Sequence, residues 1–525
     1  MSVRAAQGHA HAGRGLLLKA CIFATGMSGV VAEYAISTLA GYLLGNEVVQ
    51  FSLIVSTMLF AMGLGSRLSR RITGSLLDAF IVLEIILSLV CAVSAVSVYA
   101  LAFSLTTVGV VIYAFALAIG LLIGLEIPLV TRINERYEDL RVNVSSVMEH
   151  DYYGALLGGL IFAFVALPYL GLTYTPIALG AVNAGIAAVL FFRYRRSFRF
   201  RRALGVAVVA TPLVLAGLAL RAEPIRRYGE QARYRDPIVF EEQTRFQKIV
   251  MTSWRGDHWF YLDGNLQFST VDERRYHEPL VHPALALAPS RARVLLLGAG
   301  DGMAAREVLK YEDVESVTLV DLDPAVTELA RTHPVLVAQN EGSLSDPRVT
   351  VVSEDAYSYL GRTNGFYDVI IADFPDPKSV GLARLYSVEF YRLLERHLGP
   401  GGVFVTQATS PFFSQEAFLS VLKTVRAAGL SAVPYRNHVP TLGEWGFVLG
   451  VKPPEGRPIA AAALKRRLER ETFPGLGTEF LGRDAMKHLL NFGKDELAPY
   501  AGVRVSSERN HAVAAYYRTG RWDLN

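Results

Sequence analysis

The sequence predicts a multi-pass α-helical membrane domain, followed by a small antiparallel β domain and a Rossmann-like α/β domain of the methyltransferase type. Three observations support this fold class. Of the 525 residues, 51% are hydrophobic, and the excess lies in the first 220. Short β-rich runs follow in residues 237–270, and from residue 294 onward strand patterns alternate with helix patterns. That alternation is typical of a parallel sheet with crossover helices.

These shifts in composition divide the chain into four expected parts. They are residues 1–220 (polytopic transmembrane domain), 221–285 (small β part), 286–455 (Rossmann-like domain) and 456–525 (helical C-terminal appendage).

Seven apolar stretches in the first part are each about long enough to cross a hydrocarbon core of roughly 30 Å. Arginine is concentrated after the second, fourth and sixth stretches, which places the N-terminus in the cytoplasm by the positive-inside rule. The chain is therefore expected in the cell membrane. The stretches are 16–44, 48–66, 76–103, 107–131, 152–172, 174–192 and 204–220.

The last stretch is the weakest, because it is only about 17 residues long and is interrupted by Pro212. A spanning helix needs roughly 20 residues. Seven crossings would place everything after Leu220 outside the cell. A re-entrant or interfacial segment there would return the C-terminal half to the cytoplasm. Six and seven crossings both stay open at this point.

Several residues inside the apolar stretches are unusual for lipid-facing helices. Glu33, Glu84 and Glu126 are ionisable, and such groups are costly within a membrane. They are equally compatible with helix–helix hydrogen bonds and with recognition of a cation. Glycines in 63–65 and 154–159 indicate close helix packing.

The glycine turn after residue 294 is the most informative part of the soluble half. Apolar residues 294–297 predict a buried strand that ends in Gly298-Ala299-Gly300-Asp301, an arrangement that holds a nucleoside in doubly wound domains. Gly298 and Gly300 are expected to let the backbone approach the ligand, since they lack a Cβ atom. A carboxylate at Asp301 would repel a pyrophosphate and attract a cation. The turn therefore favours a positively charged nucleoside, such as a sulfonium, over NAD.

Aspartates end four successive predicted strands. Because ligands of such sheets bind at the carboxyl ends of the strands, these side chains are expected to form one acidic site. Asp321 is suited to hydrogen bonds with ribose hydroxyls. Capping of the following helices is the alternative, and it explains one such aspartate more readily than four in succession. The residues are Asp301, Asp321 with Asp323, Asp355, and Asp373 with Asp376.

Composition excludes other classes of site. The only cysteines, Cys21 and Cys91, lie in apolar stretches, so neither a disulfide framework nor a cysteine-rich metal site is expected. His258, His333 and His438 show no metal-ligand spacing. The net charge is +4, and the basic run 193–202 is more typical of a membrane topology signal than of a nucleic-acid patch.

At the level of motifs, the soluble half resembles the spermidine synthase family of aminopropyltransferases, and the whole chain is similar to its membrane-anchored variant. The motifs follow the family order over about residues 240–410. They are Phe246-Gln247-Lys248-Ile249, Leu262-Asp263-Gly264-Asn265-Leu266-Gln267, Asp272-Glu273-Arg274-Arg275-Tyr276-His277-Glu278, His282-Pro283, Gly298-Ala299-Gly300-Asp301-Gly302, Arg306-Glu307-Val308-Leu309, Glu354-Asp355-Ala356 and Asp373-Phe374-Pro375-Asp376-Pro377.

The resemblance implies a transferase of spermidine biosynthesis. Decarboxylated S-adenosylmethionine would be the donor and an amine, most often putrescine, the acceptor, giving spermidine and methylthioadenosine. It implies no metal and no further cofactor. Gln247 and Asp321 would hold the nucleoside, Asp355 would face the adenine, and Asp301 would bind the propylamine of the donor. We expect the catalytic half in the cytoplasm, where such a nucleoside is found.

The resemblance also implies roles on the acceptor side. Gln267, Tyr276 and His277 would line the donor and acceptor channel. Asp373 would take the proton from the attacking amine, and Asp376 would hold the distal ammonium.

The chain departs from the family pattern near the acceptor. Phe374-Pro375 replaces two small hydroxyl residues, and Lys378 places a positive charge near the diamine end. The usual loop tyrosine near 440 is absent, although Glu444-Trp445 follows. The reaction class is therefore predicted and the amine is left open.

Two other functions remain as alternatives. One is a methyltransferase that uses S-adenosylmethionine, and the other is a membrane polyamine sensor or transporter component with a degenerate domain. Expected partners are the small-molecule substrates and the lipid bilayer, with no nucleic acid. A homo-oligomer is neither indicated nor excluded.

Overall fold

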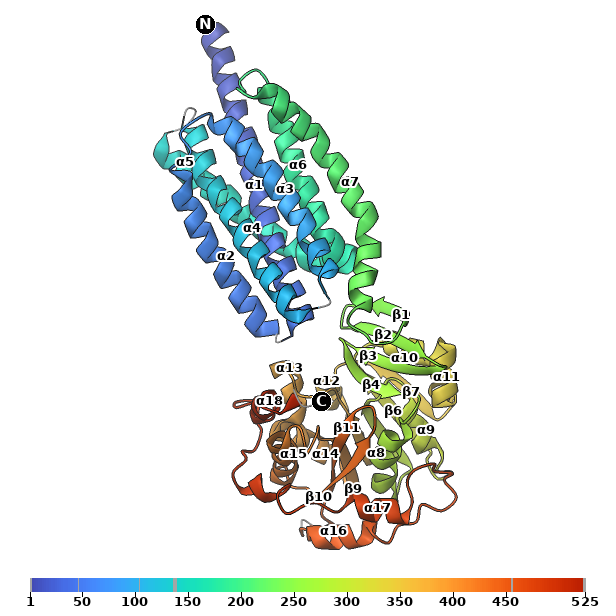
Figure 1. Cartoon of the computed structure of the whole chain (residues 1–525). Helices are drawn as coiled ribbons and strands as arrows, with labels where there is room; N and C mark the ends of the chain where they lie inside the picture. Colours follow the sequence, from blue (N-terminus) through green and yellow to red (C-terminus); the bar gives the residue numbers. More distant parts are fainter. Residues whose placement is uncertain (1, 46, 103, 136–138, 455–456, 523–525) are drawn as a thin grey trace. The chain divides into compact units, whose positions relative to one another are not determined.

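The computed structural model describes residues 2–45, 47–102, 104–135, 139–454 and 457–522, and the chain forms two compact units, Met1–Pro237 and Ile238–Asn525 (Figure 1). The boundary expected at residue 220 falls inside a continuous helix. The compact unit therefore extends to the end of that helix and a short turn beyond it.

The first unit is a bundle of long helices. Six helical runs in its described residues are long and apolar enough to cross a membrane. The elements are α1 (Ser2–Leu44), α2 (Glu47–Ser69), α3 (Leu76–Ala100), α4 (Leu105–Asn134), α5 (Leu140–Ile161), the π-helical η1 (Phe162–Leu170), α6 (Gly171–Tyr194) and α7 (Arg201–Gln231).

Three of the seven predicted stretches differ in their helical boundaries. The fifth and sixth belong to one run, Leu140–Tyr194, in which Pro168 lies in the π-helical segment and Gly171 leaves helical geometry with φ 63° and ψ −175°. The seventh is not shortened by its proline. Helix α7 continues for 31 residues through Pro212 and Pro224. Of the three acids, Glu84 and Glu126 are buried and Glu33 is half-buried.

Close helix packing is confirmed at Gly65, Gly154 and Gly158 of the predicted glycines, whereas Gly63 has open space around it. A Cβ atom on Gly65 of α2 would lie 2.1 Å from the carbonyl oxygen of Leu121 in α4, and one on Gly124 would lie 2.1 Å from that of Met62. Only glycine allows this approach between the two backbones. Tyr113 of α4 donates to Gln50 near the start of α2, and Arg132 of α4 donates to Ser69 at the end of α2, so the two helices run parallel and end on the same side of the bundle.

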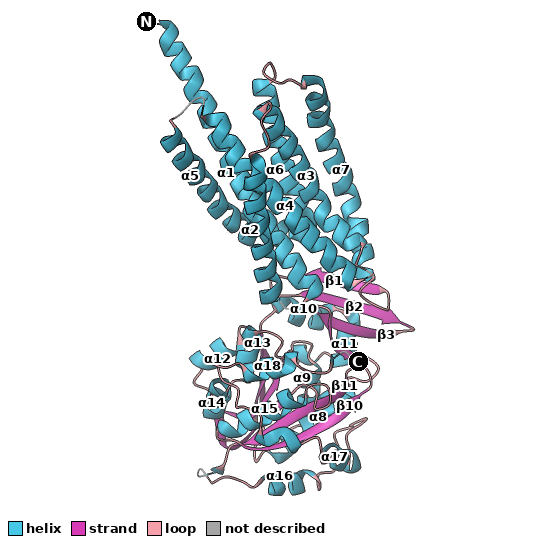
Figure 2. Cartoon of the chain, turned by 60° about the vertical axis from the view of Figure 1, so that its left-hand side comes forward, coloured by secondary structure: helices cyan, strands magenta, loops and turns pink. Residues whose placement is uncertain are grey.

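The second unit contains the described strands (Figure 2). The expected small antiparallel sheet is confirmed, with strands in sequence order. These are β1 (Ile238–Gln243), β2 (Lys248–Trp254), β3 (Asp257–Leu262) and β4 (Asn265–Ser269).

The larger sheet has seven strands in the order β10-β11-β9-β8-β5-β6-β7. The five strands β5 to β9 are parallel to one another. Strands β10 and β11 form an antiparallel hairpin beside β9. The five parallel strands match those predicted. The bounds are β5 (Arg293–Gly298), β6 (Ser316–Asp321), β7 (Val349–Ser353), β8 (Tyr367–Asp373), β9 (Leu398–Gln407), β10 (Ser431–Val439) and β11 (Gly443–Val451).

Helices cover both faces of this sheet. Strand β5 is therefore buried on both sides, and residues 294–297 are fully inaccessible to solvent. The helices are α8 (Arg274–Leu287), α9 (Met303–Leu309), α10 (Pro324–Thr332), α11 (Pro334–Asn340), α12 (Ala356–Arg362), α13 (Val380–Ala383), α14 (Val388–His397) and α15 (Gln415–Ala427).

The C-terminal segment is not an appendage. Leu464 of α16 (Ala461–Leu468) and Met486 of α17 (Arg483–Leu489) join the core on one face of the sheet. Val513 and Tyr517 of α18 (Ala512–Arg518) join the core on the other face. The segment therefore completes the core of the second unit.

Candidate active site

Three aspartates meet at one edge of the large sheet. Asp373 ends β8, Asp321 ends β6, and Asp301 follows β5, which lies between those two strands. Parallel strands bring their carboxyl ends together, as the sequence indicated. The charge of Asp301 acts on both other carboxyls. The edge is therefore a single acidic site.

Asp373 is half-buried and held by a tyrosine. The phenol of Tyr276, on α8, donates a 2.6 Å hydrogen bond to its Oδ1 atom. Burial raises the pKa of the Asp373 carboxyl to about 6, and the Asp301 charge adds to this effect. The nearby His277 and the bond from Tyr276 act in the opposite direction. The carboxyl can therefore accept a proton near neutral pH.

His277 is fixed from behind by a buried ion network. Its Nδ1 atom lies 2.8 Å from Oε2 of Glu273, and Glu273 in turn accepts bonds of 2.8 and 3.0 Å from Arg306. Burial alone would lower the pKa of His277, but the bond to Glu273 raises it above its ordinary value. The ion network thus fixes the imidazole beside Asp373.

The glycines of this turn lie against other residues of the same unit. A Cβ atom on Gly298 (φ 77°) would lie 2.1 Å from the carbonyl oxygen of Asp373, and one on Gly300 would lie 2.6 Å from Oδ2 of Asp321. The Gly300 amide donates a 3.1 Å bond to that oxygen. The glycines therefore make room for the chain's own acids. Burial raises the pKa of Asp321 to about 6.

Gln247 approaches this edge from the small sheet. Its Nε2 atom donates a 3.1 Å bond to Oδ2 of Asp323, which also caps α10 by accepting from the Ala325 amide. The amide of Asp323 donates to Oδ1 of Asp321. The small sheet and the second strand end are therefore linked beside the acidic cluster.

Asp355 and Gln267 make their hydrogen bonds elsewhere among the described residues. Asp355 caps α12 through the Ser358 amide and forms a 2.9 Å ion pair with Arg384. Gln267 donates to the carbonyl oxygen of Asn265 in its own strand. In this structure Asp355 therefore caps a helix, as Asp323 does, and its role toward the adenine stays a prediction.

Asp376 is bound by a residue that the sequence did not reveal. The phenol of Tyr517, on α18, donates a 2.8 Å bond to its Oδ2 atom. Burial raises the pKa of Asp376, while the charge of Lys378 and the bond from Tyr517 act against this. Lys378 itself is hydrogen-bonded to Asn265 of the small sheet.

Within the described residues, no group of three or more His, Cys, Asp or Glu side chains is arranged to hold a metal ion.

A Rossmann-like sheet whose strand ends carry carboxylates and a tyrosine-held aspartate defines a nucleoside-dependent transferase of cationic substrates.

Comparison with known proteins narrows this class. A model of the spermine/spermidine synthase domain matches residues 273–458. The chain is 42% identical over 501 residues to polyamine aminopropyltransferase 2 of Aquifex aeolicus, covering 95% of this chain and 98% of that protein. It is 40% identical to polyamine aminopropyltransferase 2 of Ralstonia nicotianae, covering 95% and 97%. A spermidine synthase crystallised with the transition-state analogue AdoDATO is similar, with TM-score 0.45 and 24% identity over 51% of this chain and 89% of that one. The chain belongs to the polyamine aminopropyltransferase family.

Proposed function

We propose that the chain transfers an aminopropyl group from decarboxylated S-adenosylmethionine to a diamine, putrescine, giving spermidine and methylthioadenosine. The observation that carries this proposal is the tyrosine-held Asp373 beside Asp301 and His277, with Asp376 three residues further on. This edge offers a proton acceptor for one amine and carboxylates for the remaining cations.

On the donor side, Gln247 and Asp321 hold the nucleoside, at the turn shaped by Gly298 and Gly300, and Asp355 faces the adenine. Asp301 binds the propylammonium of the donor. The intact donor carries a carboxylate in addition, which Asp301 and Asp373 would repel. The decarboxylated donor is therefore the better match for this edge.

On the acceptor side, the alkylammonium must first lose a proton, which costs roughly 4 to 5 kcal/mol at neutral pH for a pKa of about 10.4. Asp373 accepts that proton and, fixed by Tyr276, orients the nitrogen. The freed lone pair forms a bond to the methylene beside the sulfonium, and the carbon–sulfur pair moves to sulfur as methylthioadenosine leaves. Gln267 and His277 line the channel, and Asp376 holds the distal ammonium. The sulfonium is already an activated leaving group, so we propose no cofactor or metal.

The proposal is tested by product analysis. The purified full chain is incubated with the decarboxylated donor and a panel of diamines, and methylthioadenosine is measured. We expect release that depends on the amine and is greatest with putrescine. Methyl transfer from the intact donor would support the methyltransferase alternative. Amine binding without methylthioadenosine would support a sensor or transporter component.

We also propose that the first unit spans the cell membrane and contacts the lipid bilayer, with the catalytic unit in the cytoplasm. The six apolar helical runs support the membrane location, and the arginines that follow α2, α4 and α6 place the ends of these helices in the cytoplasm. The cytoplasmic placement of the catalytic unit rests on its nucleoside donor, which is found inside the cell, and it requires that α7 lies in the membrane interface and does not cross the bilayer. In sealed vesicles of known orientation, protease should reach the catalytic unit only from the cytoplasmic face. Cleavage only from the opposite face would contradict the placement.

The raised pKa values of Asp373 and Asp321 predict an acid limb in the pH profile. Both carboxyls must be ionised in the free enzyme, and both have a pKa of about 6. We expect kcat/KM to rise with pH up to and slightly beyond pH 6. Bound cations favour the ionised carboxylates, so the limb in kcat should lie at lower pH. A kcat/KM profile that is flat from pH 5 to 7 would contradict this assignment.

Tyr517→Phe should weaken acceptor binding. The change removes one hydrogen bond to a carboxylate, which corresponds to a rise in the acceptor KM of about five- to tenfold. The donor KM and kcat should change little. Tyr516→Phe is the matched control, because that phenol lies against the Arg504 amide instead. Equal effects of the two substitutions would show that α18 acts only through folding.

A further inference from the structure

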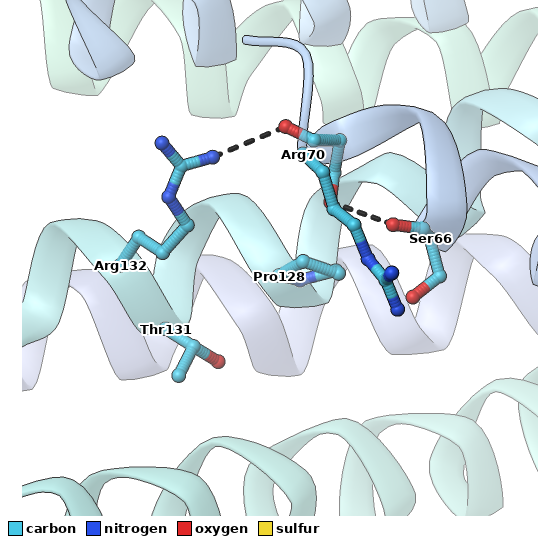
Figure 3. A pocket seen from close by; sticks show the side chains of 6 residues that line it. Ser66, Arg70, Pro128, Thr131 and Arg132 are labelled. Atoms are coloured by element: carbon cyan, nitrogen blue, oxygen red, sulfur yellow. Dashed lines mark hydrogen bonds between the residues drawn. The ribbon is translucent and has the colours of Figure 1, made fainter. Parts of the chain in front are cut away.

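A cavity of about 460 Å³ lies at the end of the first unit where α2 and α4 both terminate. Its lining is basic and hydroxylic, without a carboxylate. Figure 3 shows Arg132 on one side of Pro128 and Arg70 on the other. The residues that line it are Ser66, Ser69, Arg70, Pro128, Thr131 and Arg132.

Arg132 is held in place by the end of the neighbouring helix. Its guanidinium donates to the carbonyl oxygens of Ser69 (3.1 Å) and Ile72 (2.8 Å). These bonds use two of its five N–H groups and leave the charge without an acidic partner among the described residues. Arg70 is exposed and likewise forms no ion pair with a described residue. The site thus presents two uncompensated cations in fixed surroundings.

The backbone beneath the cavity is rigid, because α2 and α4 touch at Gly65 and Gly124 just before it. Apolar surface continues from the cavity along both helices. Leu59 precedes Ser66 by two helical turns and is 58% exposed, and Leu117 precedes Pro128 by three turns and is 42% exposed. A ligand with an anionic head and an apolar tail fits this combination of surfaces.

We propose that this cavity binds the phosphate of an anionic phospholipid headgroup, with an acyl chain lying along the exposed apolar side chains of α2 and α4. The inference depends on the proposed membrane location of the first unit. By the positive-inside rule this end faces the cytoplasm, where basic pockets between helices attract anionic lipids. Free phosphate shares the headgroup chemistry, but it would not contact the exposed apolar side chains of α2 and α4.

The test measures retention of phosphatidylglycerol, relative to phosphatidylcholine, by the purified full chain in mixed vesicles and in native mass spectrometry. Arg70→Gln should lower the preference about fivefold. Arg132→Lys keeps the charge but loses the planar fork, and it should also lower the preference. Arg71→Gln is the matched control, since it removes the same charge outside the cavity and should change the preference less than twofold.

Three outcomes would overturn the proposal. The first is an equal loss of lipid preference in Arg71→Gln and Arg70→Gln, which would indicate diffuse electrostatic attraction. The others are no preference for phosphatidylglycerol in the unaltered chain and full displacement of the lipid by inorganic phosphate. Carbonate extraction of the vesicles separates this failure from that of the membrane placement. A chain that stays in the vesicles without lipid preference refutes only the lipid site, whereas a chain that is extracted refutes the placement itself.

Discussion

Asp373→Asn should lower kcat by at least about a hundredfold, as expected for removal of a general base. The amide keeps the shape of the side chain and can still accept the hydrogen bond from Tyr276, but it cannot take a proton from the amine. Donor binding should be largely preserved, because Asp301, Asp321 and Gln247 are unchanged. Single-turnover methylthioadenosine release and donor calorimetry measure the two effects separately. The acid limb in kcat/KM should also lose the contribution of this carboxyl.

Asp368→Asn is a suitable control, since Asp368 lies near the opposite end of the same strand and accepts a 2.9 Å hydrogen bond from the Arg293 amide there. It should retain nearly full turnover. Near-normal kcat in Asp373→Asn would reject its role as the proton acceptor. A loss of donor affinity as large as the loss of turnover would instead assign Asp373 to binding.

The convergence of the acids could be predicted from local patterns alone. Each of Asp301, Asp321 and Asp373 follows a short apolar run, and the geometry of parallel strands brings such positions to one edge. The contacts of Asp376 could not be predicted in this way. Its partner Tyr517 is 141 residues away in the sequence, on a short helix placed by core packing. Such a contact depends on tertiary structure, for which one sequence carries no periodic signal.

The glycine turn and the apolar segments of the first unit also depend on tertiary structure that local sequence patterns do not reveal. The sequence indicated a close approach at Gly298 and Gly300, but not whether ligand or protein would fill the space. In the first unit, hydropathy predicted where apolar segments occur. It did not predict that a π-helical segment, followed by Gly171, would join the fifth and sixth stretches, because such a segment depends on backbone geometry and not on polarity.

Arg306→Met should destabilise the catalytic unit by about 3 to 5 kcal/mol, as expected when one member of a buried ion network is removed. Arg306 is 3% exposed and binds both Glu273 and Glu307. Without it these two buried carboxylates lose their shared cation, and His277 loses its rigid support. Urea unfolding, followed by hydrogen exchange of the β5 amides in the full chain, measures the loss. Arg331→Met, which alters an exposed arginine on α10, is the matched control.

The penalty of Arg306→Met should also depend on pH in a defined direction. Burial would raise the pKa of Glu273, but bonds from His277 and Arg306 lower it to about 2, and the pKa of Glu307 is likewise lowered. A lowered carboxyl pKa stabilises the fold above the unfolded value of about 4.3, and this stabilisation is lost as the pH falls toward 2. The stability gap between the unaltered chain and the variant should therefore be full at pH 7 and narrow below about pH 4. A gap that stays constant over this range would show that Arg306 stabilises the unit through packing and not through its charge.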